Sequence, residues 1–252
     1  ATRDPWAPSS DRPRQLKGLK AARLVRALVD VAPPFGATYL AQATGLSQPY
    51  ISRLLDALQE QGLIRRQGRR IEHVDWMGLL RARAETYSLL KAPSAGYVAP
   101  QGPDAVLEFL AAAQTGAGVS AGQVAVTGTV AAASVAPLAL GGQLILYLGP
   151  SPGQEVRQVD LADPVLLRRL RLLPQTNGGN VLLVAAEDPV VFTGCRQVRG
   201  VPHVALSQLA LDCLTGPGRM PSEGEEILSY MEKTTREWRK TNLSEWQVAD
   251  LS

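Results

Sequence analysis

Residues 47–53 carry the side chains of this sequence that are best suited to recognising another molecule. Glutamine can form two hydrogen bonds with an adenine edge and arginine two with a guanine edge, and each pair gives about 1–3 kcal/mol of discrimination between bases. Gln48 and Arg53 fall on the outward side of this stretch if it forms an amphipathic helix. The other candidate DNA contacts in the stretch are Ser47, Pro49, Tyr50 and Ser52. The stretch is therefore a predicted recognition helix for double-stranded DNA.

A basic cluster follows this helix in the sequence. Four arginines surround Gly68: Arg65, Arg66, Arg69 and Arg70. Residues 63–66 and 71–74 flank a turn at 67–69, which predicts a small hairpin. Arginines on such a hairpin can reach phosphates or the minor groove, so they are candidate DNA contacts. A charge run alone would instead favour a solvated surface without a partner.

The helices around this block have clear start and stop signals. Residues 16–31 predict a first amphipathic helix, which Pro33 and Pro34 end. Residues 38–43 predict a short second helix before a tight turn at 44–46, and Thr38 at its start is a further candidate DNA contact. In the third helix Ser47 is the expected N-cap and proline occupies the first turn. Its apolar residues must face the core: Ile51, Leu54, Leu55 and Leu58. The order helix, turn, helix and basic hairpin describes a winged helix-turn-helix domain over residues 16–91.

The charges of the chain are unevenly distributed. Residues 1–95 carry 15 basic and 8 acidic side chains, a net charge of +7, whereas the remainder carries 11 and 15, a net charge of −4. This asymmetry predicts that the N-terminal half meets a polyanion and that the C-terminal half does something else. The 45% hydrophobic fraction excludes a disordered chain. Residues 1–15, with three prolines and no apolar run, predict a flexible arm rather than a signal peptide.

The C-terminal half alternates between helix and strand patterns. Helices are expected at 105–113, 130–140, 164–172 and 207–214, and strands at 124–127, 143–148, 180–185, 190–192 and 201–205. Residues 93–96 look like a linker, and Ser222 with Glu225 has capping-box spacing before a last helix. The predicted fold class is α+β: the winged domain first, then a mixed α/β domain over 97–240 and a tail at 241–252. Residues 109–154 carry no charge, but repeated glycines exclude a membrane span.

The sequence resembles AbiEi-family antitoxins of type IV toxin–antitoxin systems and related bacterial winged helix-turn-helix regulators over about residues 16–240. The resemblance rests on GLSQPYISRLLDALQEQGLIRR at 45–66, VAVTGTVAAASVAPLALGGQLILYLG at 124–149, LLPQTNGGNVLLVAAEDPVVF at 172–192 and HVALSQLALDCLTGPGR at 203–219. It implies an N-terminal domain that represses its own operon through repeated DNA sites. It also implies a C-terminal domain that counteracts a nucleotidyltransferase-like toxin protein.

Catalytic motifs are weak in comparison. Residues 118–122 match the G-x-S-x-G nucleophile elbow, but a helix pattern precedes them and a strand follows, the reverse of what that motif needs. The overlapping residues 116–121 imitate a dinucleotide fingerprint with the same defect. The strand after Gly142 has leucines where nucleotide transfer would need carboxylates for magnesium. We therefore expect no enzyme activity, no cofactor and no metal.

The remaining chemically active residue types have ordinary structural interpretations. Cys195 and Cys213 lack neighbours at metal spacing and are expected to be reduced core residues. His203, in an apolar run, is expected to be a hydrogen-bonded core or edge residue. Trp238 and Trp246 are expected to pack rather than form a ligand cage. The basic group Arg168, Arg169 and Arg171 is expected to form an exposed helix face, with a second phosphate-contacting patch as the alternative.

These patterns together predict a cytoplasmic, sequence-specific DNA-binding regulator without a membrane segment. Its expected partner is double-stranded operator DNA, and the resemblance to AbiEi antitoxins implies a cognate toxin protein as a further partner. A rival interpretation is a ligand-sensing repressor whose C-terminal domain binds a small molecule in its Gly/Ala-rich region. An enzyme tethered to DNA is a third, disfavoured by the missing acid–base and metal constellations.

Overall fold

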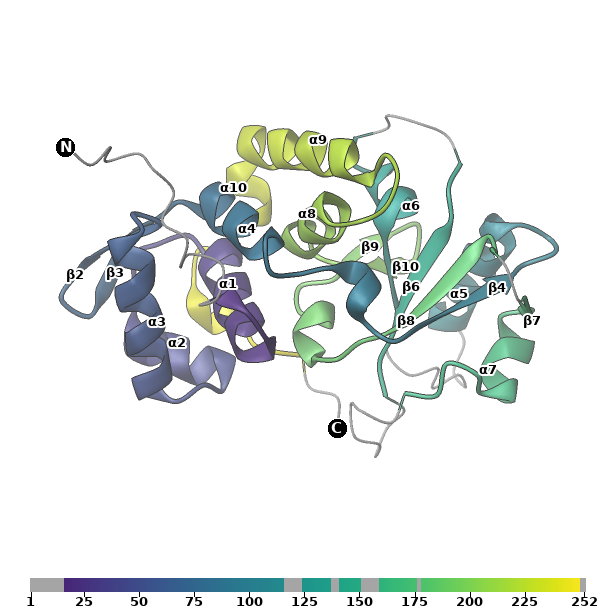
Figure 1. Cartoon of the computed structure of the whole chain (residues 1–252), viewed down its shortest axis with the longest axis horizontal. Helices are drawn as coiled ribbons and strands as arrows, with labels where there is room; N and C mark the ends of the chain where they lie inside the picture. The colour runs from purple at the N-terminus through teal and green to yellow at the C-terminus, as the bar shows by residue number, and fades with distance from the viewer. Residues whose placement is uncertain (1–15, 116–123, 137–140, 151–158, 176–177, 250–252) are drawn as a thin grey trace, which may run out of the picture. The chain divides into compact units, whose positions relative to one another are not determined.

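The computed structural model describes residues 16–115, 124–136, 141–150, 159–175 and 178–249 (Figure 1). The chain forms two compact units. The first comprises Ala1–Tyr87 with Arg239–Gln247, and the second comprises Ser88–Trp238 with Val248–Ser252. The C-terminal stretch of the chain is therefore divided between both units.

The N-terminal unit has the helix and strand order of a winged helix-turn-helix domain. Its elements are α1 (Leu19–Asp30), β1 (Phe35–Gly36), α2 (Ala37–Thr44), α3 (Gln48–Glu60), β2 (Ile64–Gln67), β3 (Arg70–Val74), α4 (Trp76–Ala84) and η5 (Leu243–Glu245). The strands form one antiparallel sheet in the order β1-β3-β2. Strand β1, which is two residues long, was not anticipated from the sequence because it is too short to show an alternating pattern.

Local sequence signals account for these boundaries. Gly45 follows α2 with φ 67°, a left-handed conformation that glycine adopts without steric cost, and it turns the chain into α3. Asp75 caps α4, since its Oδ1 accepts a hydrogen bond of 2.9 Å from the Gly78 amide. Helix α4 ends at Ala84, and Leu90 beyond it is 49% exposed.

Residues 239–247 pack within the N-terminal unit, so the expectation of a tail over 241–252 is corrected for most of that segment. The Lys240 amide donates to the Asp30 carbonyl over 2.7 Å, and the Ala32 amide donates to the Lys240 carbonyl over 2.8 Å. Leu243 and Trp246 are 4% and 2% exposed, respectively. Removing their apolar surface from water stabilises the packed segment relative to a free tail.

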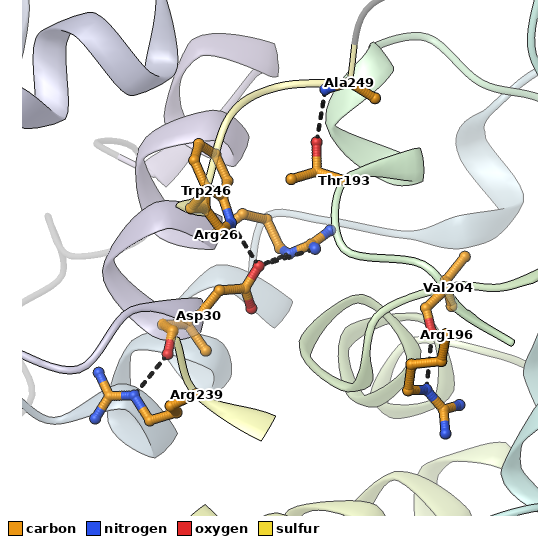
Figure 2. A network of polar contacts seen from close by, with 9 residues as sticks. Arg26, Asp30, Thr193, Arg196, Val204, Arg239, Trp246 and Ala249 are labelled. Carbon is orange, nitrogen blue, oxygen red and sulfur yellow. Dashed lines mark hydrogen bonds and ion pairs between the residues drawn. The ribbon is translucent and has the colours of Figure 1, made fainter. Parts of the chain in front are cut away.

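A buried polar cluster joins this segment to α1. Figure 2 shows Trp246 and Arg26 converging on the carboxylate of Asp30, with Arg239 close to the same helix end. Trp246 Nε1 donates to Asp30 Oδ2 over 2.9 Å, as does Arg26 Nη2. Arg239 donates to the carbonyls of Val29 over 2.9 Å, of Val31 over 2.7 Å and of Leu28 over 3.2 Å. Arg239 thus satisfies carbonyls that the end of α1 leaves without intrahelical partners.

The C-terminal unit is built on a seven-stranded sheet. Its strands are β4 (Ser94–Val98), β5 (Val124–Thr127), β6 (Leu144–Leu148), β7 (Leu173–Pro174), β8 (Val181–Ala185), β9 (Arg196–Val198) and β10 (Val201–His203). Their order is β7-β4-β8-β6-β5-β10-β9. The pairs β6–β8 and β10–β5 are parallel and the other pairs antiparallel. All residues of β6 are buried, which places the core at this strand.

Helices complete this unit: η2 (Leu89–Lys91), α5 (Pro103–Thr115), α6 (Gly128–Ala132), α7 (Pro164–Arg169), η4 (Pro189–Phe192), α8 (Leu206–Leu214), α9 (Met220–Lys233) and α10 (Thr235–Trp238). Helices α8 and α9 pack against each other and both contact α6 (Figure 1). The fold class expected from the sequence, a winged domain followed by a mixed α/β unit, is confirmed.

Some elements of this unit differ from the sequence-based expectations. Residues 94–96, assigned with Pro93 to a linker, lie in β4 and pair with β8. Residues 190–192, expected as a strand, belong to the 3-10 helix η4, which Asp188 caps. Helix α9 begins at Met220, so the expected capping box at Ser222 lies inside the helix. Strand β4 forms because β8 supplies its distant partner, whereas η4 is fixed by the local cap of Asp188.

No helix in the described part of the chain has both the length and the apolar character that crossing a lipid bilayer requires.

Candidate nucleic-acid interface

The N-terminal half of α3 presents a polar surface to solvent. Ser47, Gln48, Pro49, Ser52 and Arg53 are exposed. The opposite face of α3 is buried, as the helical spacing predicted: Ile51, Leu54, Leu55 and Leu58. Ser47 occupies the N-cap position, but its side chain makes no capping hydrogen bond. The chain therefore holds the predicted base-reading side chains on one rigid, outward face.

Tyr50 is the one member of this group that is half-buried. The ammonium of Lys20 lies 5.9 Å from the centre of its ring, a cation–π distance. Burial raises the pKa of the Tyr50 phenol, and the nearby Arg83 and Arg53 oppose that shift. The phenol therefore stays protonated at neutral pH and can donate a hydrogen bond.

Helix α1 contributes basic residues to this region that the sequence analysis did not identify. Lys20 is exposed beside Tyr50 in the first turn of α3. Arg23 reaches the turn between α2 and α3, where its Nη1 would lie 3.8 Å from a Cβ added at Gly45. Lys20 and Arg23 lie in an amphipathic helix, where basic residues are expected on the solvent face. Their spacing of three residues places them on the same side of the helix, and this spacing was the signal in the sequence that could have identified them.

The hairpin carries exposed arginines at three of the four predicted positions. Arg65, Arg69 and Arg70 are exposed, and the Arg69 carbonyl accepts a hydrogen bond of 3.0 Å from the Ala37 amide. This bond places the tip beside the first turn of α2, in which Thr38 is also exposed. Arg70 Nε pairs with Glu72 over 2.9 Å. The exposed guanidinium groups can donate to phosphate oxygens in a bidentate manner.

Arg66 differs from the other hairpin arginines. Its Nη2 pairs with Asp56 over 2.6 Å, and its Nε donates to Gln59 over 3.0 Å, so it is bound to the C-terminal half of α3. Its side chain is only 15% exposed. Arg66 therefore positions the hairpin against α3, and this packing competes with its predicted DNA contact.

Two buried carboxylates of the C-terminal unit accept hydrogen bonds from several neighbouring side chains. Asp212 accepts from Thr127 Oγ1 over 2.6 Å, from Tyr147 over 3.1 Å and from Gln208 over 2.8 Å. Glu223 accepts from Thr129 Oγ1 over 2.8 Å and from Arg219 Nε over 3.0 Å. These carboxylates come from helices α8 and α9 rather than from a strand, and their contacts are those of structural core groups.

The other residues of this unit that the sequence analysis discussed have the surroundings of residues that hold the fold. His203 is 4% exposed, and its Nδ1 lies 3.0 Å from the Val201 carbonyl. Burial raises the pKa of the Cys213 thiol, which makes it a poor nucleophile. Cys195 is half-buried. Within the described residues no group of His, Cys, Asp and Glu could hold a metal ion. The G-x-S-x-G match at 118–122 and the fingerprint match at 116–121 lie outside the described residues.

The basic group at the end of α7 is exposed, as expected. Arg168 and Arg169 lie in its last turn, where they complement the helix dipole. Arg171 follows with φ 52° and donates to Gln101 over 3.1 Å. Trp238 packs with its Nε1 donating to the Met231 carbonyl over 2.8 Å.

A family model matches the N-terminal part of the chain. Residues 16–82 match the Crp-like helix-turn-helix domain. The match covers α1, α2, α3 and the hairpin, the elements that carry the surface described above. Neither a curated protein nor a solved structure shows a significant match to the chain.

Proposed function

We propose that this protein is a transcription regulator that binds operator DNA sequence-specifically through its N-terminal unit. The observation that carries this proposal is the exposed polar face of α3 beside the basic hairpin tip, within a domain similar to Crp-like helix-turn-helix domains. A helix presented in this way fits the major groove of B-DNA, which is about 12 Å wide. Gln48 and Arg53 read bases, whereas Arg65, Arg69 and Arg70 contact phosphates.

A titration of the full-length protein with DNA tests this proposal. The wild type is expected to bind duplex DNA from upstream of its own gene more tightly than an arbitrary duplex, with affinity that falls steeply with salt. Gln48→Ala or Arg53→Ala should reduce the preference between the two duplexes, by about 1–3 kcal/mol for a bidentate contact. Arg69→Ala should instead weaken binding to both duplexes equally. Absence of binding to either duplex at low salt would refute the proposal.

For the C-terminal unit, the proposed role is protein binding without catalysis, in an autorepressing antitoxin that counteracts a nucleotidyltransferase-like toxin. The resemblance of residues 124–149, 172–192 and 203–219 to AbiEi antitoxins supports this role. The net charge of −4 beyond residue 95 also favours a protein partner over a nucleic acid.

Co-expression tests this second role. If the neighbouring gene encodes a toxin, the full-length protein and a Gln48→Ala/Arg69→Ala variant should both restore growth, because neutralisation does not require DNA binding. Failure of rescue would contradict the antitoxin role. A small molecule that then raised the melting temperature and released DNA would establish the ligand-sensing alternative.

A further inference from the structure

An open groove of about 950 Å³ lies in the N-terminal unit beside the hairpin tip. One side is formed by Arg69 and Arg70, another by the start of α2 with Tyr39, and a third by residues 241–244 with Gln247. Of the described residues that line it, two are arginines and none is acidic. The groove therefore attracts anions. Its walls include the hairpin tip and the start of α2, the two elements that are expected to approach a DNA backbone.

The wall formed by residues 241–247 separates apolar from polar side chains. Leu243 and Trp246 are buried in the unit, whereas Thr241, Ser244 and Gln247 are exposed. These three polar residues line the groove together with Leu243. Each set recurs at intervals of three residues, which matches the 3-10 turn of η5 at the centre of the segment. Hydroxyl and amide side chains are, with arginine, the groups that proteins use to contact phosphate oxygens.

The segment is held rigidly at both ends. Trp246 Nε1 is hydrogen-bonded to Asp30, and the backbone of Lys240 is hydrogen-bonded to Asp30 and Ala32. Asn242 Oδ1 accepts from the Ser244 amide over 3.0 Å and so fixes the turn between them. Polar groups held in place lose less conformational entropy on binding than those of a free tail.

We infer that Thr241, Ser244 and Gln247 extend the DNA interface and bind the phosphate backbone of the duplex together with Arg69 and Arg70. This inference rests on the proposed DNA binding and assigns a new part of the surface to it. The Arg70 ion pair with Glu72 engages Nε, and the two terminal nitrogens of the guanidinium carry further N–H donors. Backbone contacts of this kind are independent of base sequence.

Anisotropy titrations of the full-length protein with a short labelled duplex of arbitrary sequence test the inference. Ser244→Glu and Gln247→Glu place a negative charge in the groove and should weaken binding about two- to tenfold at low salt. Ser222→Glu is the matched control, because Ser222 is an exposed serine of α9 in the other unit. It changes the net charge equally and should bind as the wild type does.

Ser244→Lys separates a local contact from damage to the fold. It should tighten binding and steepen the plot of log affinity against log salt by about 0.9, one additional phosphate contact. A destabilised domain would not bind more tightly. If both Glu variants and Ser244→Lys bind like Ser222→Glu while Arg69→Ala weakens binding, the inference is wrong and the proposed function stands. If the wild type binds no duplex at all, both fall.

Discussion

At the scale of single residues, the structure distinguishes side chains that are available for recognition from those used to hold the fold. Gln48 and Arg53 are exposed on α3, whereas Arg66, of the same type and next to Arg65, is engaged by Asp56. A basic residue in a cluster is therefore not interchangeable with its neighbours. A surface ion pair such as that of Arg66 with Asp56 contributes little to the stability of the protein, but it determines where the guanidinium points.

Asp212 is expected to be the most sensitive buried polar residue of the C-terminal unit. Asp212→Ala removes the acceptor of the hydrogen bonds from Thr127, Tyr147 and Gln208, so we expect a loss of about 3 kcal/mol or more in the free energy of unfolding. Asp212→Asn is the matched variant. Its amide oxygen can accept from Tyr147 and Gln208, and its NH₂ can donate to the Thr127 hydroxyl, so the loss should be much smaller. Urea unfolding measures both, and equal losses would contradict this account.

His203 makes stability depend on pH in the acidic range. Burial lowers the pKa of His203 below its ordinary value of 6.5, and the nearby Arg196 lowers it further. As the pH falls below 6.5, the unfolded chain takes up a proton that the folded form resists, so this contribution to stability is present above pH 6.5 and is lost below it.

The stability of the wild type is therefore expected to fall between about pH 7.5 and pH 5.5. His203→Gln should reduce that pH-dependent loss, as followed by the urea midpoint at each pH. His73→Gln removes an exposed histidine and serves as the control. A His203→Gln variant with the full wild-type pH dependence would rule out this residue as the cause.

At the scale of elements, the end of α1 depends on residues that lie far along the chain. Arg239 donates to three backbone carbonyls at the C-terminal end of α1, those of Leu28, Val29 and Val31. Burial lowers the pKa of the Arg239 guanidinium to about 10, which still leaves it charged at neutral pH. A cation at this position also interacts favourably with the negative end of the helix dipole.

Arg239→Ala should therefore destabilise the N-terminal unit by about 2–3 kcal/mol, because it removes these hydrogen bonds and the favourable charge. Arg239→Lys keeps the charge without the forked donor geometry and should recover only part of the loss. Thermal unfolding of the two variants beside the wild type measures the difference. A wild-type melting temperature for Arg239→Ala would show that the end of α1 does not depend on this cap.

At the scale of the whole molecule, the chain divides into units that do not coincide with halves of the sequence. The N-terminal unit is completed by Arg239–Gln247, after the chain has passed through the whole C-terminal unit. A fragment ending near residue 91 would lack Leu243 and Trp246 and would expose the apolar surface that they cover. The DNA-binding unit is thus discontinuous in sequence.

Deletion of residues 239–252 should accordingly lower the melting temperature of the N-terminal unit and weaken binding to all duplexes. Deletion of 248–252 is the control, since it leaves residues 239–247 in place and removes the hydrogen bond from the Ala249 amide to Thr193, within the other unit. Calorimetry and the anisotropy titration report the two effects separately. If the two deletions had the same melting temperature and the same affinity for DNA, residues 239–247 would be dispensable for the stability and DNA binding of the N-terminal unit.

Much of the DNA-binding domain could be predicted from the sequence because its signals are local. The spacing of Ile51, Leu54, Leu55 and Leu58 identifies the buried face of α3 and, by exclusion, its outward side chains. Glycines at 45 and 68 mark the turns in the same way. These patterns depend on the geometry of one helix or one turn, so they can be recognised without knowing what packs against them.

The tertiary structure alone decided which distant residues complete these elements. The Trp246–Asp30 hydrogen bond joins residues 216 positions apart, and β4 forms a strand because β8 supplies its partners. A sequence pattern shows that Leu243 and Trp246 are apolar, but not which surface buries them. Long-range pairing depends on the shape and the unsatisfied groups of both partners at once, and this information lies in the folded arrangement rather than in either segment.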